Sequence, residues 1–167
     1  VNIRYALIPY LYSEFMKCAL RDESMYRPLA FDYPDDERAC RVEDQIMMGG
    51  ECMLAPVYEQ NAKGRYVYLP EDMLMVRMRS VDDYEEVKMP KGDHYVAVDT
   101  DQLIFFIKRN TAIPVAKPAM RVKDIDPATI TMHGWLDQPY TYELYDDDGL
   151  RKDVKLENGI RYIQAEV

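Results

Sequence analysis

The spacing of the apolar residues changes near Tyr26, and this change limits the possible folds more than any other feature of the sequence. Before Tyr26 the apolar side chains recur at the spacing of a helix. After it they alternate with polar ones, or form short solid runs that end at Pro, Gly or an acidic pair. Turn signals about every 8 to 12 residues favour an antiparallel sandwich over a parallel sheet with crossover helices. We therefore predict a mainly β fold, in which an N-terminal α-helix is followed by one or more antiparallel β-sandwich subdomains.

The helix is predicted over residues 2–20, and its apolar side is expected to be buried. The main stripe on this side has a spacing of four residues and consists of Ile3, Leu7, Leu11, Phe15 and Ala19. The stripe is widened by Tyr5, Ile8, Tyr12 and Met16. Pro9 lies inside the segment and has no backbone N–H to donate, so we expect a kink or a helix start near it.

The strands predicted after Tyr26 are short, and each is bounded by turn residues. They cover residues 27–33, 45–48, 52–58, 66–69, 74–79, 85–89, 94–98, 103–108, 129–135, 141–145, 154–156 and 160–166. Asn158-Gly159 is the strongest hairpin signal, because both residues tolerate a positive φ. Gly49-Gly50 is interpreted as a tight turn between two strands, since it lacks the further glycines and the Lys of a phosphate-binding loop.

The charge and the apolar runs argue against two classes of partner. The net charge is -9 and the isoelectric point is about 4.7, so the chain is expected to repel nucleic acid. No apolar run reaches the roughly 18 to 20 residues that a membrane helix needs, and the run 103–107 is stopped by two basic residues. Cys18, Cys40 and Cys52 are odd in number and lack metal-ligand spacing, which predicts reduced thiols and a cytoplasmic location.

Acidic patches are the first candidates for metal binding or acid–base chemistry, but their spacing supports neither. They lie at Asp35-Asp36-Glu37, at Asp82-Asp83, at Asp99 with Asp101, and at Asp146-Asp147-Asp148. A calcium loop of the EF-hand type that began at Asp146 would end correctly at Glu157, yet Arg151 stands where this loop requires Gly. We interpret the patches as solvated turns, because a glycosidase acid needs a carboxyl that is held in a pocket.

Histidine and serine provide no clearer motif. His94 and His133 have neither a metal-spaced companion nor a nucleophile beside them. Ser13, Ser24 and Ser80 lack the glycines of a nucleophile elbow. We therefore predict no catalytic, cofactor-binding or metal-binding residue in this chain, and no cofactor.

The chain contains 14 tyrosines, several of which alternate along the predicted strands. Tyr66 with Tyr68, and Tyr140 with Tyr142, could form a platform for a sugar ring, near the single Trp135. Packing at sheet faces and domain interfaces explains the same pattern, because a Tyr ring can be buried while its hydroxyl stays wet. A stand-alone carbohydrate-binding module and a purely structural interaction domain both stay open as alternatives.

A series of short blocks, taken in order, carries a resemblance to a known family. The blocks cover residues 4–12, 26–29, 31–36, 44–49, 54–58, 65–70 and 104–114, and end at the turn Tyr145-Asp146-Asp147-Asp148-Gly149. Together they resemble the end of the catalytic barrel and the following β domain of glycoside hydrolase family 31, the α-glucosidase and α-xylosidase family. The resemblance covers residues 3–150, and the stretch after Lys152 carries no motif of the family.

Two departures from the family pattern concern loop shape. Where the family has a Gly near the end of the strand in block 104–114, this chain has Asn110 or Thr111, so a turn there is expected to differ. The Trp that usually follows the family's Leu-Pro pair is absent between Glu71 and Met75.

The resemblance implies a larger parent, a retaining α-glucosidase that removes terminal α-linked glucose from oligosaccharides. In such enzymes one Asp attacks the sugar and a second Asp serves as acid and then as base. Both come from barrel strands that precede the first block, and no residue of this chain matches them. The chain alone is expected to be inactive. Its implied partners are the upstream catalytic barrel and, for the parent, the α-linked oligosaccharide.

The same resemblance predicts three parts of the chain. Residues 1–26 would be a helix at the end of the barrel, residues 27–116 a proximal β-sandwich, and residues 117–167 a second, smaller β subdomain or an extension of the first. The first residue, Val1, agrees with a segment of a longer chain. Leaving a few hundred Å² of the apolar helix side in water would cost several kcal/mol, at about 25 cal/mol per Å². We therefore expect the helix to fold back onto the sandwich or to form a homo-oligomer.

Overall fold

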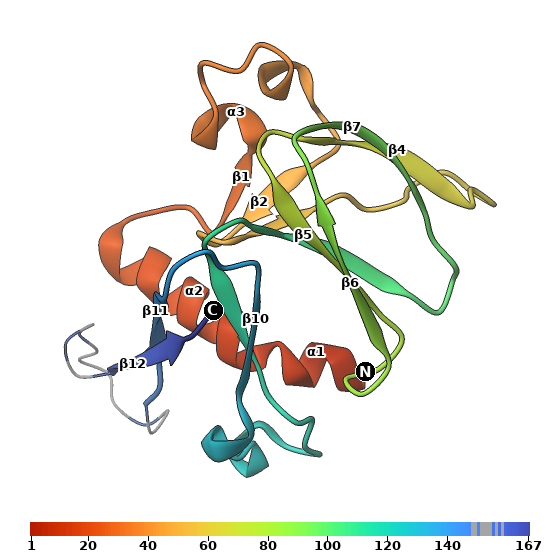
Figure 1. The fold of residues 1–167 in the computed structure, drawn as a ribbon. Coiled ribbons are helices and arrows are strands. Elements are labelled where there is room, and N and C mark those ends of the chain that lie inside the picture. The colour runs from red at the N-terminus through yellow and green to blue at the C-terminus, as the bar shows by residue number, and fades with distance from the viewer. Residues whose placement is uncertain (148–149, 151–154, 156, 158) are drawn as a thin grey trace.

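The computed structural model describes residues 1–147, 150, 155, 157 and 159–167, and its ribbon is drawn in Figure 1. The helices and helical turns are α1 (Asn2–Ala6), α2 (Ile8–Arg21), α3 (Leu29–Asp32), η1 (Ala39–Arg41), η2 (Val122–Asp124) and η3 (Pro127–Thr129). The strands are β1 (Tyr26–Pro28), β2 (Ile46–Met48), β3 (Cys52–Leu54), β4 (Gly64–Leu69), β5 (Met73–Met78), β6 (Tyr84–Met89), β7 (Gly92–Ala97), β8 (Leu103–Lys108), β9 (Ala112–Val115), β10 (Thr131–Gly134), β11 (Tyr140–Tyr145) and β12 (Ile160–Ala165). The described strands pair antiparallel, which confirms the predicted mainly β fold with a leading helix.

The leading helix is broken at Leu7, as the position of Pro9 predicts. Pro9 lies at the start of α2, where the helix requires no backbone hydrogen bond from it. At the other end, Asp22 takes a left-handed conformation with φ 56° and ψ 38°. The Glu23 N–H then donates to the Cys18 carbonyl at 2.9 Å, which ends α2.

The largest sheet has six strands in the order β1-β2-β3-β8-β5-β6. β2 and β3 form a hairpin in which Met48 lies opposite Cys52. Gly49 turns the chain between them with a φ of 69°, which confirms the tight turn predicted at Gly49-Gly50. β8 enters the sheet between β3 and β5, so strands that are far apart in the sequence complete it.

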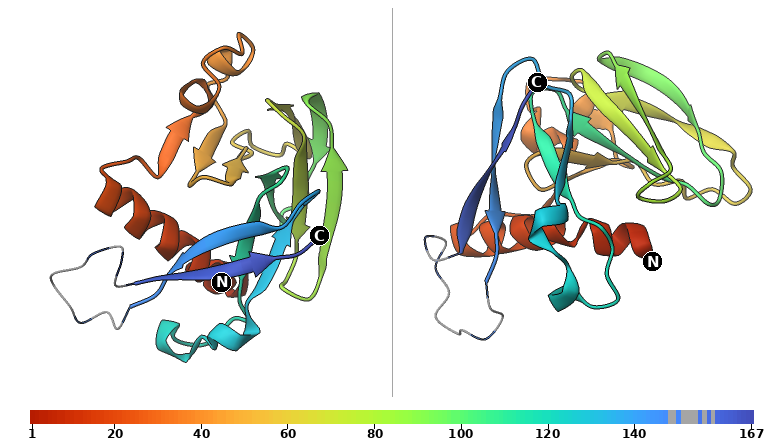
Figure 2. Two further views of the ribbon diagram at one scale, coloured as in Figure 1. Left: turned by 60° about the vertical axis from the view of Figure 1, so that its left-hand side comes forward. Right: turned by 60° about the horizontal axis from the view of Figure 1, so that its bottom comes forward.

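Three strand pairs flank this sheet: β4 with β7, β9 with β10, and β11 with β12. Figure 1 shows β11 and β12 beside α2, with β4 and β7 at the opposite side of the molecule. The two views of Figure 2 agree that α1 and α2 lie along one flank, with the strands to one side of them. The Ala116 N–H donates to the Ala6 carbonyl at 2.9 Å and ties the end of β9 to α1.

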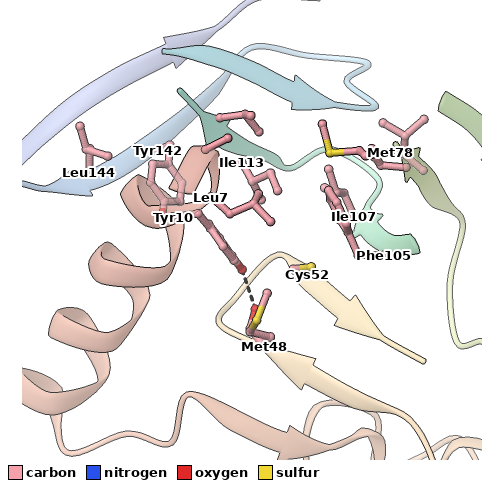
Figure 3. Close-up of a cluster of buried hydrophobic side chains, with 14 residues drawn as sticks. Leu7, Tyr10, Met48, Cys52, Met78, Phe105, Ile107, Ile113, Tyr142 and Leu144 are labelled. Atoms are coloured by element: carbon pink, nitrogen blue, oxygen red, sulfur yellow. Dashed lines mark hydrogen bonds between the residues drawn. The ribbon is translucent and has the colours of Figure 1, made fainter. Parts of the chain in front are cut away.

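The six-stranded sheet separates two apolar cores, because the central strands carry apolar residues on both faces. One core lies against α1, α2, β9 and β11 and receives Leu74, Val76, Met78, Phe105 and Ile107 from the central strands. Figure 3 shows this core. The other lies against β4, β7 and α3 and receives Met73, Met75 and Phe106. The alternation of neighbours such as Phe105 and Phe106 assigns each side chain to one core.

The strand predicted over residues 27–33 is wrong in its second half. Only Tyr26–Pro28 is a strand, and the chain then forms the helical turn α3. The Arg27 guanidinium reaches Asp32 with distances of 2.7 Å from Nε to Oδ1 and 2.8 Å to Oδ2, and Leu29 is buried in the second core. A short apolar run does not by itself distinguish a strand from a helical turn. The Arg27–Asp32 ion pair and the burial of Leu29 favour the helical turn here.

Prolines explain two smaller differences. β3 ends at Leu54, two residues before Pro56, rather than at the predicted residue 58. β9 was not predicted as a separate strand because it contains Pro114, which lies opposite Met132 in the two-stranded pair with β10. Pro is tolerated there because such a pair leaves one side of each strand without a ladder partner.

Asn110 occupies the turn where the family pattern has Gly. Its φ is 63°, a left-handed value that Asn tolerates better than most residues. The Asn110 side chain also accepts a hydrogen bond from the Asp137 N–H at 2.9 Å. Asn110 therefore takes the backbone conformation that a Gly would take, and the turn need not change shape because the Gly is absent.

Some predictions lie wholly or partly outside the described residues. These are the hairpin turn at Asn158-Gly159, the strand 154–156 and the turn that includes Asp148 and Gly149. The boundaries proposed at residues 26 and 116 stay predictions. Within the described part of the chain, no helix is both long and apolar enough to cross a membrane.

Candidate functional site

The side of α2 that is buried differs from the predicted one. Leu7 is buried as expected, but the inward side of α2 carries Tyr10, Ser13, Glu14, Lys17 and Cys18. Two members of the predicted stripe point away from the sheet, since Phe15 is 57% exposed and Ala19 is also exposed. The helix has therefore folded back onto the sandwich, as one of the two alternatives proposed, but with its polar residues inward.

Polar partners from distant segments explain this orientation. The Ser13 hydroxyl donates to the Pro9 carbonyl at 2.6 Å and accepts from the Tyr145 N–H at 2.8 Å. The Tyr10 hydroxyl donates to the Met48 carbonyl at 2.6 Å, a bond that Figure 3 shows from α2 to the end of β2. Because burying a polar group without a partner is costly, these bonds select the side that faces the sheet.

Glu14 is the centre of a buried cluster that we call the polar joint, formed by Tyr10, Glu14 and Lys17 of α2, Gly49 to Glu51 of the hairpin turn, and Tyr140 and Tyr142 of β11. Glu14 Oε1 accepts from the Tyr142 hydroxyl at 2.8 Å and pairs with Lys17. Its Oε2 accepts from the Gly50 N–H at 3.0 Å. Glu14 therefore connects three separate segments of the chain.

Glu51 is a second buried carboxyl in the polar joint, with 7% of its surface exposed. Its Oε1 accepts from the Tyr140 hydroxyl at 2.8 Å, whereas its Oε2 is buried and accepts no hydrogen bond from the described residues. Burial, and then the charge of Glu14, raises the pKa of Glu51. Burial and the two carboxyls together also raise the pKa of Tyr142.

Two carboxyls beside a hollow are also the pattern expected of a retaining glycosidase. A hollow of about 780 Å³ is lined by Glu14, Glu51 and Tyr140, among others. Both oxygens of Glu14 are engaged by donors, and Glu51 Oε2 is closed off from solvent. A nucleophile or an acid must present a carboxyl oxygen to the sugar. Neither carboxyl does so in this arrangement, which suits a structural clamp.

The side of α2 that faces away from the sheet is apolar, and we call it the outer face. It consists of Ile8, Tyr12, Phe15, Met16 and Ala19, which follow one another at helical spacing. A groove of about 790 Å³ adjoins it, in which Ile8 and Tyr12 meet Val122, Ile125 and Ile130. Exposed apolar surface of this extent on one helix is typical of a contact with another domain or chain.

Two of the acidic patches are engaged in ion pairs with basic side chains from other segments. Asp36 accepts from Lys91 at 2.6 Å and from the Tyr68 hydroxyl at 2.7 Å, and these bonds hold the pKa of the Asp36 carboxyl below its usual range. Asp99 and Asp101 share Arg79, each at 3.1 Å. Among the residues that the structure describes, no three His, Cys, Asp or Glu side chains are arranged to hold a metal ion.

The tyrosines proposed as a sugar platform lie apart. Tyr66 is 72% exposed, whereas Tyr68 is buried, and Tyr142 is buried within the polar joint with Tyr140 beside it. Over the ring of Trp135 lie two cations, Lys88 at 5.2 Å and Arg109 at 4.9 Å from its centroid. These positions do not favour the carbohydrate-binding module.

The histidines have ordinary structural partners. His133 is buried, and its Nδ1 lies 2.7 Å from Glu86 Oε1. His94 Nε2 lies 2.7 Å from the Pro90 carbonyl. The residues that sequence reasoning missed are Glu14, Lys17 and Glu51. The one available signal was that Ser13, Glu14 and Lys17 interrupt an otherwise apolar helix on one side.

Comparison with known proteins gives a consistent assignment. The family model described as "Glycosyl hydrolase family 31 C-terminal domain" matches residues 22–113. "Alpha-glucosidase 2" of Bacillus thermoamyloliquefaciens is 28% identical over 171 residues, which cover 99% of this chain and 21% of that protein. An "Alpha-xylosidase" of Saccharolobus solfataricus is 25% identical over 163 residues, covering 98% of this chain and 22% of that protein. The chain thus spans about a fifth of the length of these relatives.

Solved structures show the same arrangement of elements. A cycloalternan-forming enzyme from Listeria monocytogenes, in complex with a pentasaccharide substrate, superposes with a TM-score of 0.78 at 25% identity. The match covers 99% of this chain and 15% of that one. A dextranase from Flavobacterium johnsoniae, complexed with isomaltotriose, gives a TM-score of 0.75 at 22% identity over 99% of this chain and 20% of its own.

Proposed function

Because the chain belongs to glycosyl hydrolase family 31, we propose that it is the non-catalytic C-terminal part of a larger α-glucosidase-type enzyme and that it supports the catalytic domain. The observation that carries the proposal is the outer face of α2, which is apolar and leaves Phe15 57% exposed, although Tyr145 covers Tyr12 at its edge. The chain spans about a fifth of its relatives, so most of a whole enzyme of this kind lies outside it.

The occupant that we propose for the outer face is the catalytic barrel of the same parent chain. Phe15 and Tyr12 are aromatic residues of the kind that anchor interfaces. The groove formed with Val122, Ile125 and Ile130 extends the apolar area beside them. An interface between domains that pack permanently is more apolar than ordinary surface, and the apolar side chains of the outer face fit this, with Lys123, Asp146 and Asp147 at the rim of the groove.

The polar joint explains how the support is made rigid. It fastens the opposite side of α2 to the β2–β3 hairpin turn through Gly50 and to β11 through Tyr142. Arg21 at the end of α2 adds an ion pair of 2.6 Å with Glu143 of β11. Because α2 is fixed to both the β2–β3 hairpin turn and β11, its outer face has one orientation. A fixed orientation lowers the entropy cost of a contact between domains.

For the parent we propose an α-linked oligosaccharide as substrate, in agreement with the names of the glucosidase and dextranase relatives. We also propose a cytoplasmic location, which the free Cys18, Cys40 and Cys52 support.

Phe15→Lys tests the docking role. In the full-length enzyme this variant is expected to lower the free energy of unfolding by about 2 kcal/mol or more and to reduce activity, because a charge replaces a buried aromatic anchor. In the chain of residues 1–167 alone the same change is expected to stay within about 0.5 kcal/mol, since Phe15 is exposed there. The measurements are urea unfolding and hydrolysis of an α-glucoside.

Phe31→Lys is the matched control, because Phe31 is 71% exposed and lies on α3, away from the outer face. It should change neither protein by more than about 0.5 kcal/mol. If both lysine variants impair the full-length enzyme equally, or if neither does, the outer face of α2 is not the docking surface. If the isolated chain dimerises and Phe15→Lys makes it monomeric, the same face serves as a contact in the absence of the barrel.

The chain alone is expected to show no turnover of p-nitrophenyl α-glucoside, since neither Glu14 nor Glu51 offers a free carboxyl oxygen to its hollow. Release of p-nitrophenol is the measurement, with the full-length enzyme as the positive control. Turnover that disappears in Glu14→Gln or Glu51→Gln would place a catalytic centre in this chain and contradict the supporting role.

A further inference from the structure

The unpartnered oxygen of Glu51 is the one feature of the polar joint that the supporting role leaves unexplained. Glu51 Oε2 is buried, and among the described residues nothing donates a hydrogen bond to it. Leaving a buried charged oxygen without a donor is costly, far more so than leaving a neutral one. The protonation of Glu51 therefore depends on which donors surround it.

The hydroxyl and amide donors of the polar joint already direct their hydrogens elsewhere. The Tyr10 hydroxyl donates to the Met48 carbonyl, and the Tyr142 hydroxyl donates to Glu14 Oε1. The Gly50 N–H donates to Glu14 Oε2, and Lys17 pairs with Glu14 Oε1. The remaining donor, the Tyr140 hydroxyl, serves Glu51 Oε1. The Lys17 ammonium has further hydrogens, but no recorded bond joins it to Glu51, and no described donor reaches Glu51 Oε2. The simplest resolution is that this oxygen carries its own hydrogen.

A neutral carboxyl removes the buried charge that has no donor, and a neutral oxygen without a partner costs far less than a charged one. We propose that Glu51 is a neutral carboxylic acid in the folded protein and that ionisation of this acid loosens the joint between α2 and the sheet.

The charges around Glu51 support this assignment. The groups that face it are Tyr10, Glu14 and Lys17 from α2, Cys52 from β3, Tyr140, Tyr142 and Glu143 from β11, and Arg21 and Arg27 across the hollow. Within the joint one carboxylate, Glu14, is balanced by one ammonium, Lys17. A second buried carboxylate at Glu51 would lack a cation of its own and would repel Glu14.

The direction of the pH dependence follows from the raised pKa of Glu51, which has burial as its main cause and Glu14 as its second. Between the pKa of Glu51 in the unfolded chain and its higher pKa in the folded one, the folded protein binds more protons. The contribution of Glu51 to stability is therefore fully present at low pH and is lost as the pH rises through the folded pKa. Each unit of difference between the two pKa values changes the folding equilibrium constant about tenfold.

Urea unfolding of the 167-residue chain across a pH series tests the proposal, with Glu51→Gln and Glu14→Gln as a matched pair. Gln is close to a neutral Glu in shape and carries no charge, so Glu51→Gln should fold. It should not show the loss of stability with rising pH that the unmodified 167-residue chain shows. Glu14→Gln removes the partner of Lys17 and should lower the folding equilibrium constant about tenfold or more at neutral pH. Equal losses in the two variants at neutral pH would overturn the proposal.

Infrared spectroscopy can detect the proton on Glu51 directly, without a measurement of stability. Infrared difference spectra of the unmodified 167-residue chain at neutral pH should contain the carbonyl stretch of a protonated carboxylic acid, and this band should be missing from Glu51→Gln. If the band is absent from the folded unmodified chain, Glu51 is ionised and the inference fails, whether or not the outer face of α2 docks to a barrel.

Discussion

Replacing Gly49 with Ala is expected to lower the free energy of unfolding by about 2 to 4 kcal/mol, because two independent costs add. Gly49 has a φ of 69°, in the left-handed region that a residue with a Cβ disfavours by about 1 to 2 kcal/mol. A Cβ at this position would also lie 2.5 Å from Glu14 Oε2 and 2.6 Å from the Tyr10 hydroxyl oxygen. It would displace both side chains from the polar joint.

Gly50→Ala is the control for this substitution. A Cβ on Gly50 would meet nothing within 4 Å, its φ is not in the left-handed region, and its N–H to Glu14 is retained. The expected change for Gly50→Ala is within about 0.5 kcal/mol. Urea unfolding measures both variants. Similar midpoints for the two would show that the hairpin turn can shift away from α2 without penalty, contrary to a rigid polar joint.

Phe105→Ala is expected to cost about 3 to 5 kcal/mol, a large share of the stability of an ordinary domain. Phe105 is 2% exposed and lies in the core that joins α1, α2 and β11 to the sheet. Removing its ring leaves a cavity between elements that are far apart in the sequence and that cannot close around it easily. The loss should appear in thermal and urea unfolding alike.

Phe31→Ala serves as the reference for Phe105→Ala, because the same atoms are removed from a ring that is largely exposed. Its expected effect is within about 0.5 kcal/mol. A loss below 1 kcal/mol for Phe105→Ala would mean that the helices are not packed on the sheet in solution. That result would remove the structural basis of both the docking role of α2 and the polar joint.

Local sequence patterns predicted the parts of the fold that depend on neighbouring residues. The break before Pro9 and the turn at Gly49-Gly50 follow from backbone preferences, and the strand β8 at Leu103–Lys108 follows from a short apolar run that ends at basic residues. The structure confirms all three. The family resemblance, carried by short ordered blocks, is confirmed by the match over residues 22–113. α3 was missed because an apolar run near Leu29 is compatible with more than one conformation.

The sequence by itself determined that a helix precedes a two-sided β fold and that the chain belongs with a family of sugar hydrolases. Only the tertiary structure decided which side of α2 is buried, and it brought Glu14 together with Glu51 and Tyr142. The physical reason is that a helix with apolar residues around most of its circumference has no single preferred side. Its orientation depends on hydrogen-bond partners such as Tyr142, which lies 128 residues away from Glu14 along the chain.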